Sequence, residues 1–153
     1  MTTCDYGRRV VVDLPFERAL PETVQAFRAE GLHLVGRFDV REFLERTCQH
    51  DFRRYVLLDV APAQTMLEAL LEDFGAGAIV PTHVAVFELA DGETAVYVAE
   101  PFGGLASDAP WRSASPRLAA LADRTSSQLA HALDRLDEVA SHRHTAATEA
   151  FVM

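Results

Sequence analysis

The clearest pattern in the chain runs from Tyr55 to Pro101, where apolar and polar positions change their spacing segment by segment. An apolar run, YVLLDVA, stops at Pro62 and predicts a strand. The next segment predicts a helix that ends at Gly75, because its apolar residues recur three and four positions apart: Met66, Leu67, Leu70, Leu71 and Phe74. Two alternating runs, THVAVFELA and TAVYVAEP, are joined by Asp91-Gly92 and predict a hairpin.

The flanking segments supply the remaining elements. Residues 8–14 and 32–38 predict two more strands, because they are rich in β-branched or alternating apolar residues. A helical stripe follows Phe16, and Asp39 with Glu42 matches an N-terminal capping box for a short second helix. A long last helix is expected over residues 116–139.

This order of elements, β-α-β-α-β-α-β-β-α, predicts an α+β fold. We expect a two-layer sandwich with a mixed or antiparallel sheet of about five strands and helices mainly on one face. A three-layer sandwich is the alternative. Residues 1–140 are expected to form a single domain, and residues 141–153 a flexible tail.

Composition narrows the class of partner. A formal net charge of −9 disfavours nucleic acid, because phosphate binding needs a basic face. No apolar run approaches the ~20 residues of a membrane span, and the N-terminus lacks the pattern of a signal peptide. We therefore expect a cytoplasmic protein without a membrane partner, in which Cys4 and Cys48 are free thiols.

His83 is the leading candidate for chemistry. It stands at the start of the fourth predicted strand, near the point where the third strand ends at Asp59. A histidine and a carboxylate at such a position can act as a base and its orienting group. Asp59, Glu88 and Glu100 are the candidate carboxylates, and a strand histidine without a role is the alternative.

A ligand site is expected beside His83. Its candidate residues are His83, Thr82, Tyr55, Phe102 and Trp111. Phe102 and Trp111 belong to a Gly-rich segment that either caps the core or covers a pocket. A second possibility is an anion site, because arginine binds carboxylate or phosphate in a bidentate manner; its residues are Arg37, Arg41, Arg53 and Arg54. The alternative is that these arginines pair with acidic residues of the surface, of which the sequence offers many.

Metal and cofactor sites find little support. Cys48, His50 and Asp51 lie close together, but they lack the second ligand pair of a zinc site unless His142 and His144 fold back onto them. The sequence has no lysine, so a Schiff base or a P-loop lysine is excluded. We predict no metal and no cofactor.

Several short features together resemble a known family. They follow in the same order and spacing: Phe16, Glu30-Gly31-Leu32, Phe38-Asp39-Val40, Tyr55, Pro62, Leu67, Ala69-Leu70, Val80-Pro81, Val84-Ala85-Val86 and Glu100-Pro101. Over residues 6–101 the chain thus resembles the domain of unknown function 302 family of small bacterial and archaeal α+β domains. The resemblance implies a fold but no reaction. Many members carry cysteines where this chain has Val60 and Thr82, so thiol chemistry through those positions is absent here.

Three hypotheses for function remain open. The first is a small-ligand-binding domain, with a pocket between sheet and helices. The second is an enzyme that uses His83 with a carboxylate for proton transfer. The third is a structural or partner-binding protein without a pocket. A homodimer is expected, because the last helix carries apolar residues on more than a narrow stripe.

Overall fold

A single antiparallel sheet forms the centre of the domain in the computed structural model, which describes residues 1–4, 7–90, 92–103 and 110–152. Its six strands follow the spatial order β1-β2-β6-β5-β4-β3, and each neighbouring pair is antiparallel. The strands are β1 (Thr2–Cys4), β2 (Gly7–Val12), β3 (Leu32–Asp39), β4 (Tyr55–Pro62), β5 (Thr82–Glu88) and β6 (Thr94–Ala99).

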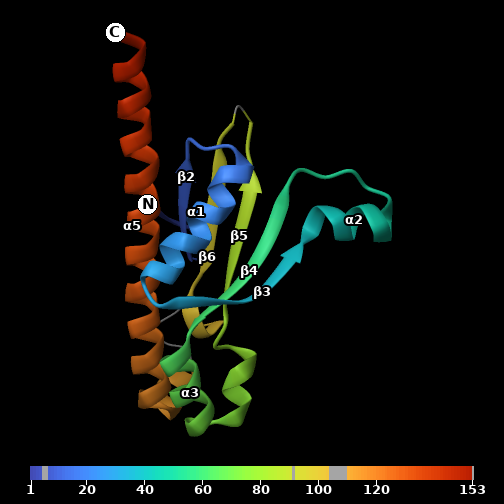
Figure 1. The fold of residues 1–153 in the computed structure, drawn as a ribbon. Coiled ribbons are helices and arrows are strands. Elements are labelled where there is room, and N and C mark those ends of the chain that lie inside the picture. Colours follow the sequence, from blue (N-terminus) through green and yellow to red (C-terminus); the bar gives the residue numbers. More distant parts are fainter. Residues whose placement is uncertain (5–6, 91, 104–109, 153) are drawn as a thin grey trace.

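Helices cover one face of this sheet (Figure 1). Helices α1 and α5 lie against each other and against that face, α3 joins β4 and α5 at one end of the sheet, and α2 stands apart. The helices are α1 (Phe16–Ala29), α2 (Val40–Cys48), α3 (Ala63–Glu72), α4 (Pro110–Ala114) and α5 (Pro116–Val152), with short 3-10 turns η1 (Phe74–Ala78) and η2 (Pro101–Gly103).

The main core lies between the sheet and the pair α1 and α5. Because strand side chains alternate between faces, every second residue of the central strands points toward these helices. The buried strand residues are Val10, Val12, Val56, Leu58, Val60, Val84, Val86, Val96 and Val98. They pack with Phe27 of α1 and with Leu129, Leu133 and Leu136 of α5. Each fully buried side chain of this size stabilises the fold by about 1.5–3 kcal/mol.

A second, smaller apolar cluster closes one end of the domain. It joins α3, η1 and η2 to the first turns of α5 through Ala69, Ala76, Val80, Phe102, Leu118, Leu121 and Ala122. The polar edge of this contact is the Glu68 carboxyl on α3, which faces Arg117 and Arg124 of α5. A hydrogen bond from Gln64 lowers the pKa of Glu68 below its ordinary value; desolvation raises it, and the two arginines lower it further.

The predicted α+β fold, with helices on one face, is confirmed. The sheet is wholly antiparallel and has one strand more than expected, because Thr2–Cys4 pairs with β2. Three residues without an apolar alternation give no strand signal in the sequence. The capping box is also confirmed in part, since Asp39 Oδ1 accepts a hydrogen bond from the Glu42 amide at 2.9 Å.

Helix α5 continues to Val152, past the end at residue 139 that its apolar stripe predicts. The stretch after Val139 contains Ala and Glu but neither Gly nor Pro, so nothing in it terminates a helix. From residue 117 to 141, the exposed side of α5 is polar apart from Ala120 and includes Asp123, Arg124, His131, Asp134 and Glu138. That outward side therefore does not provide the surplus apolar surface on which the homodimer prediction relied.

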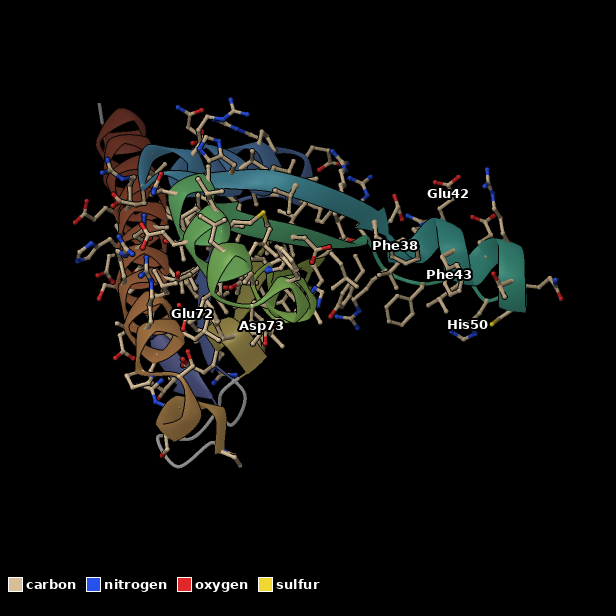
Figure 2. All side chains as sticks on the ribbon, turned by 90° about the horizontal axis from the view of Figure 1, so that it is seen from below. Phe38, Glu42, Phe43, His50, Glu72 and Asp73 are labelled. Carbon is tan, nitrogen blue, oxygen red and sulfur yellow. The ribbon has the colours of Figure 1, made fainter. Side chains whose placement is uncertain are left out.

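Helix α2 projects from the domain as an arm. We use this word for residues 37–54, which comprise the end of β3, α2 and the loop that leads into β4. Figure 2 shows α2 standing well away from the other helices, with Phe38 and Phe43 beside each other. No residue of α2 is buried, although the helix is amphipathic. The arm is therefore held by the strand pairing at its base and by the Asp39 cap.

Two predictions about the surroundings of the protein concern thiols and membranes. Cys48 is free and exposed, as expected; the Cys4 side chain lies outside the described residues. Within the described ranges, no helix combines the length and hydropathy that a bilayer crossing requires.

Gly7 allows the close approach of β2 and β6. A Cβ atom at this position would lie 1.9 Å from the Val98 carbonyl oxygen, and φ is +156°. We expect Gly7→Ala to lower the free energy of unfolding by at least about 3 kcal/mol, because the backbone of one strand has to move. Urea denaturation measures this loss.

Gly77→Ala is the matched control for this measurement. The added Cβ would meet only Leu70 Cδ2, at an ordinary 3.4 Å. The free energy of unfolding should change by no more than about 1 kcal/mol. Equal effects of the two substitutions would contradict the close approach of β2 and β6.

Candidate functional site

The sheet face opposite α1 and α5 carries several of the predicted site residues. Paired residues on neighbouring antiparallel strands share a face. One cross-strand row on this face contains Tyr55, Phe87, Ala95 and Val11; the next contains Leu57, Ala85, Tyr97 and Arg9. The third row pairs Asp59 with His83. We call this surface the uncovered face.

His83 and Asp59 meet there, as the sequence suggests. His83 Nδ1 lies 2.5 Å from Asp59 Oδ1, and the exposed fractions of the two side chains are 72% and 39%. The two side chains form an ion pair when the imidazole is protonated, and Asp59 Oδ1 is buried without a hydrogen-bond partner among the described residues. An imidazole beside a carboxylate is able to take up and hold a proton.

Gly36 makes room for this carboxylate. β3 has a register shift between Leu34 and Gly36, after which Gly36 pairs with Asp59. A Cβ atom on Gly36 would lie 3.0 Å from Asp59 Oδ2. The register shift and the glycine thus leave space for the Asp59 side chain between β3 and β5.

The other two candidate carboxylates do not meet His83. Glu88 lies at the far end of β5, and its parity along the strand is that of Val84 and Val86, which point toward the helices. The Glu88 carbonyl oxygen accepts a hydrogen bond from Arg53 at 3.2 Å. Glu100 follows β6 at the same end of the sheet as His83. Of the three carboxylates, the structure brings only Asp59 into contact with the imidazole.

Thr82 lies inside the domain. Its exposed fraction is 2%, and its Oγ1 has no hydrogen-bond partner among the described residues. Thr82 pairs directly with Val60 on β4. Val60 and Thr82, the two positions at which the family resemblance implies cysteines, are therefore cross-strand neighbours in this chain and belong to its buried interior.

Phe102 is also buried, with an exposed fraction of 1%. It packs in the second apolar cluster with Val80 and Leu118, which favours the core-capping alternative for this segment. Trp111 belongs to α4, but its side chain lies outside the described residues.

The structure brings three of the four candidate arginines into one cleft. This arginine cleft has a volume of about 510 Å³ and lies where the N-terminal turn of α1 faces the ends of β3 and β4. Its polar lining consists of Arg37, Arg41, Arg54, Glu17 and Asp39, and its remaining lining of Phe16, Leu20, Pro21, Tyr55 and Val56. Arg53 is absent from the lining. The predicted ligand residue Tyr55 thus borders both surfaces.

Local pairing positions the charged groups of this cleft. Arg54 forms an ion pair with Glu17 of α1, and Arg41 lies 3.4 Å from Asp51. Asp39 is engaged as the cap of α2. Arg37 follows Gly36 on β3 and pairs with Leu58, a core residue, so its side chain points to the helix side of the sheet.

A row of aromatic rings crosses the uncovered face, and the sequence patterns did not single it out. The aromatic row consists of Phe52, Tyr55, Phe87 and Tyr97, with successive ring centroids 6.1, 5.0 and 5.3 Å apart. The rings of Tyr55 and Phe87 are stacked, at 6° between planes. Arg9 continues the row, because its guanidinium lies 5.8 Å from the Tyr97 centroid. The available signal was the single aromatic residue on each strand of the hairpin, Phe87 and Tyr97, among aliphatic ones.

The metal candidates do not converge. Within the described part of the chain, no group of three histidine, cysteine or acidic side chains is placed to hold a metal ion. Asp51 instead faces Arg41. The side chains of His142 and His144 lie outside the described residues.

We predict that Asp59→Val raises the free energy of unfolding by about 1 kcal/mol. A buried acceptor without a hydrogen bond costs stability, and valine suits a strand better than aspartate. Thermal or urea denaturation measures the change. His83→Val is the matched comparison, because it removes the imidazole and leaves the carboxylate beside Gly36 without it. A loss of stability in Asp59→Val would contradict this prediction and show that the Asp59 carboxylate stabilises the fold.

The comparisons with known proteins agree with the fold. Residues 8–136 match the model of the family described as "Domain of unknown function DUF302". No curated protein matches the sequence. The structure is similar to the crystal structure of an uncharacterized conserved DUF302 protein from Bacillus stearothermophilus, with a TM-score of 0.70 and 22% sequence identity, over 84% of this chain and 96% of that chain. At that identity the likeness concerns the fold alone. Because the family match spans most of the chain, from β2 into α5, this protein belongs to the DUF302 family.

Proposed function

We propose that this domain binds a small organic anion in the arginine cleft. The observation that supports the proposal is the convergence of Arg37 of β3, Arg41 of α2 and Arg54 of the loop before β4 on one hollow beside α1. The sequence contains 14 basic against 23 acidic residues, so the chain as a whole is negative. The lining of the cleft, with three arginines and two acids, has the opposite sign. Such a local positive field attracts anions even when the net charge is negative.

The chemistry of arginine favours carboxylate or phosphate as the charged group. A guanidinium offers planar, paired donors that match two oxygens of either anion. Asp39 competes little, since its Oδ1 already accepts the Glu42 amide. Glu17 forms an ion pair with Arg54, so an incoming anion replaces one anionic partner of Arg54 by another.

The rest of the lining favours a ligand with an apolar body. Phe16, Leu20 and Tyr55 offer aromatic and aliphatic contact area beside the arginines. A volume of about 510 Å³ lies within the range of pockets for small molecules. An aromatic phosphate or carboxylate uses both parts of this lining, whereas inorganic phosphate uses only the arginines.

Phenyl phosphate is the probe that tests the proposal. We expect it to raise the melting temperature, with about 2.7 kcal/mol of stabilisation at 100 times its dissociation constant. Inorganic phosphate should bind more weakly, and phenol should not bind. Arg37→Glu should weaken the binding of phenyl phosphate at least roughly tenfold, because it replaces an attractive charge by a repulsive one. Isothermal titration calorimetry measures the constants.

Arg18→Glu is the matched control. Arg18 is exposed on α1 but does not line the cleft, so the same change in net charge should leave the dissociation constant within about a factor of two. Equal weakening by both substitutions would reduce the effect to net charge. Absence of phenyl phosphate binding by the parent protein would overturn the proposal.

A second candidate function is proton transfer by His83, supported by its 2.5 Å approach to Asp59. This pair lies on the uncovered face and does not line the arginine cleft. The two candidates are separated by His83→Ala, which should not change the affinity for phenyl phosphate if the arginine cleft is the site. The cytoplasmic location stays a prediction from the sequence.

A further inference from the structure

We propose that two copies of this chain form a two-fold symmetric dimer through their uncovered faces, with the arm of each copy contacting the other. The uncovered face adjoins the arginine cleft at Tyr55, and the arm carries Arg37, Arg41 and Arg54, but the dimer requires no ligand in the cleft. Its support comes from the composition of the uncovered face, from the aromatic row and from the unburied α2.

The uncovered face has the composition of a buried surface. In an antiparallel sheet with one solvated face, outward positions are expected to be polar. Here the outward positions of the four strands β2, β6, β5 and β4 are mostly apolar: Val11, Ala95, Tyr97, Ala99, Phe87, Ala85, Tyr55 and Leu57. Arg9, Asp59 and His83 are the charged or titratable members of the three rows. Alternation along the strands therefore provides two apolar faces, of which α1 and α5 cover only one.

The aromatic row gives this face the character of an interface. Aromatic side chains are enriched at the centre of protein–protein interfaces, because they bury a large area with few rotatable bonds. The pair Tyr55 and Phe87 occupies the middle of the row, on β4 and β5, on the side of the sheet opposite the described helices α1 and α5 (Figure 1).

The arm extends the same surface past the edge of the sheet. Phe38 pairs with Leu57 and therefore lies on the uncovered face. Its ring centroid is 5.3 Å from that of Phe43 on α2 (Figure 2). Both rings have an exposed fraction of 46%. Such a pair of exposed phenylalanines, on a helix without a single buried residue, marks a contact surface.

A second copy is the occupant that suits both features. An isologous pairing brings each uncovered face and each arm against its counterpart, so one contact covers two apolar surfaces of the same chain. At ~4.8 Å between strands and ~3.4 Å per residue, the four strands present a plane of roughly 20 Å by 20 Å. The nine-residue α2 adds a strip about 14 Å long. Counted on both copies, the plane of the sheet and the strip of α2 together amount to roughly 1,000 Å², which is the smallest area expected of a biological interface.

Charge supports a second copy over nucleic acid, which also stacks on aromatic rows. The chain has a net charge of −9, which disfavours the binding of a polyanion such as nucleic acid. The face itself carries one arginine, one aspartate and one histidine in its rows, so two such faces meet without strong repulsion.

Sedimentation equilibrium of the full chain tests the proposal. Protein concentrations between about 1 and 100 µM cover the range in which a dimer with a micromolar dissociation constant forms. We expect a dimer with a micromolar or lower dissociation constant. Phe87→Glu, at the centre of the row, should raise that constant at least about 100-fold, because it buries an unpaired charge. Phe43→Glu on α2 should raise it at least about tenfold, and it cannot disturb the core, since no residue of α2 is buried.

Ala120→Glu is the matched control, because Ala120 is exposed on α5, away from the uncovered face. It should leave the dissociation constant unchanged, and circular dichroism confirms that each variant is folded. Should Phe87→Glu fail to fold, Phe43→Glu decides alone. A chain that stays monomeric at the highest concentration overturns the proposal, as does a dimer that folded Phe87→Glu or Phe43→Glu leaves at parent strength.

Discussion

The packing of α1 and α5 against one face of the sheet is the constraint on which the rest of the structure depends. Phe27, Leu133 and Leu136 are buried against valines from β2, β4, β5 and β6, so the two helices and the four strands share one core. In the chain, β2, β4 and the hairpin of β5 and β6 are separated from one another by helical segments. Contact with the helices therefore fixes which strand residues point inward, and by alternation which point outward.

This one-sided arrangement explains where the candidate surfaces lie. The arginine cleft forms on the helix side, where α1 begins and the ends of β3 and β4 continue beyond it. The His83–Asp59 pair and the aromatic row lie on the opposite side. A residue's place on one side or the other follows from its parity along a strand: Thr82 is buried on the helix side, while its neighbour His83 has an exposed fraction of 72% for its side chain.

The sequence predicts much of this because its strongest signals are local. The hairpin of β5 and β6, the N-cap at Asp39 and the apolar stripes of α1 and α5 each depend on residues close together in the chain. The contact of His83 with Asp59 could be predicted because the strands that carry them, β4 and β5, are consecutive in the chain and joined by a helical connection. β1 was missed because three residues carry too little pattern, and the continuation of α5 because propensity alone, without an apolar stripe, gives a weak signal.

Alternation also cannot reveal whether a face is covered. Tyr55, Phe87 and Tyr97 read equally well as core residues and as surface residues, because an apolar outward position has the same period as an apolar inward one. The convergence of Arg37, Arg41 and Arg54 likewise depends on how β3 and β4 pair and on where α1 begins. Such information is tertiary: it appears only when the register of the sheet and the side chosen by the helices are known.

The two proposed surfaces meet in one segment, residues 37–41. Strand alternation directs Arg37 toward the cleft and Phe38 toward the uncovered face, and the Asp39 cap starts the helix that carries Arg41. Within one copy this segment is held by the pairing of β3 with β4, by the Asp39 cap and by the contact of Arg41 with Asp51, while α2 itself buries no residue. A partner that covers Phe38 and Phe43 restricts the arm, and thereby orders Arg37 and Arg41 before an anion arrives. When the dimer has already restricted the two arginines, anion binding no longer carries the entropy cost of restricting them. Dimer formation would therefore strengthen anion binding. By linkage, the anion would strengthen the dimer by the same factor.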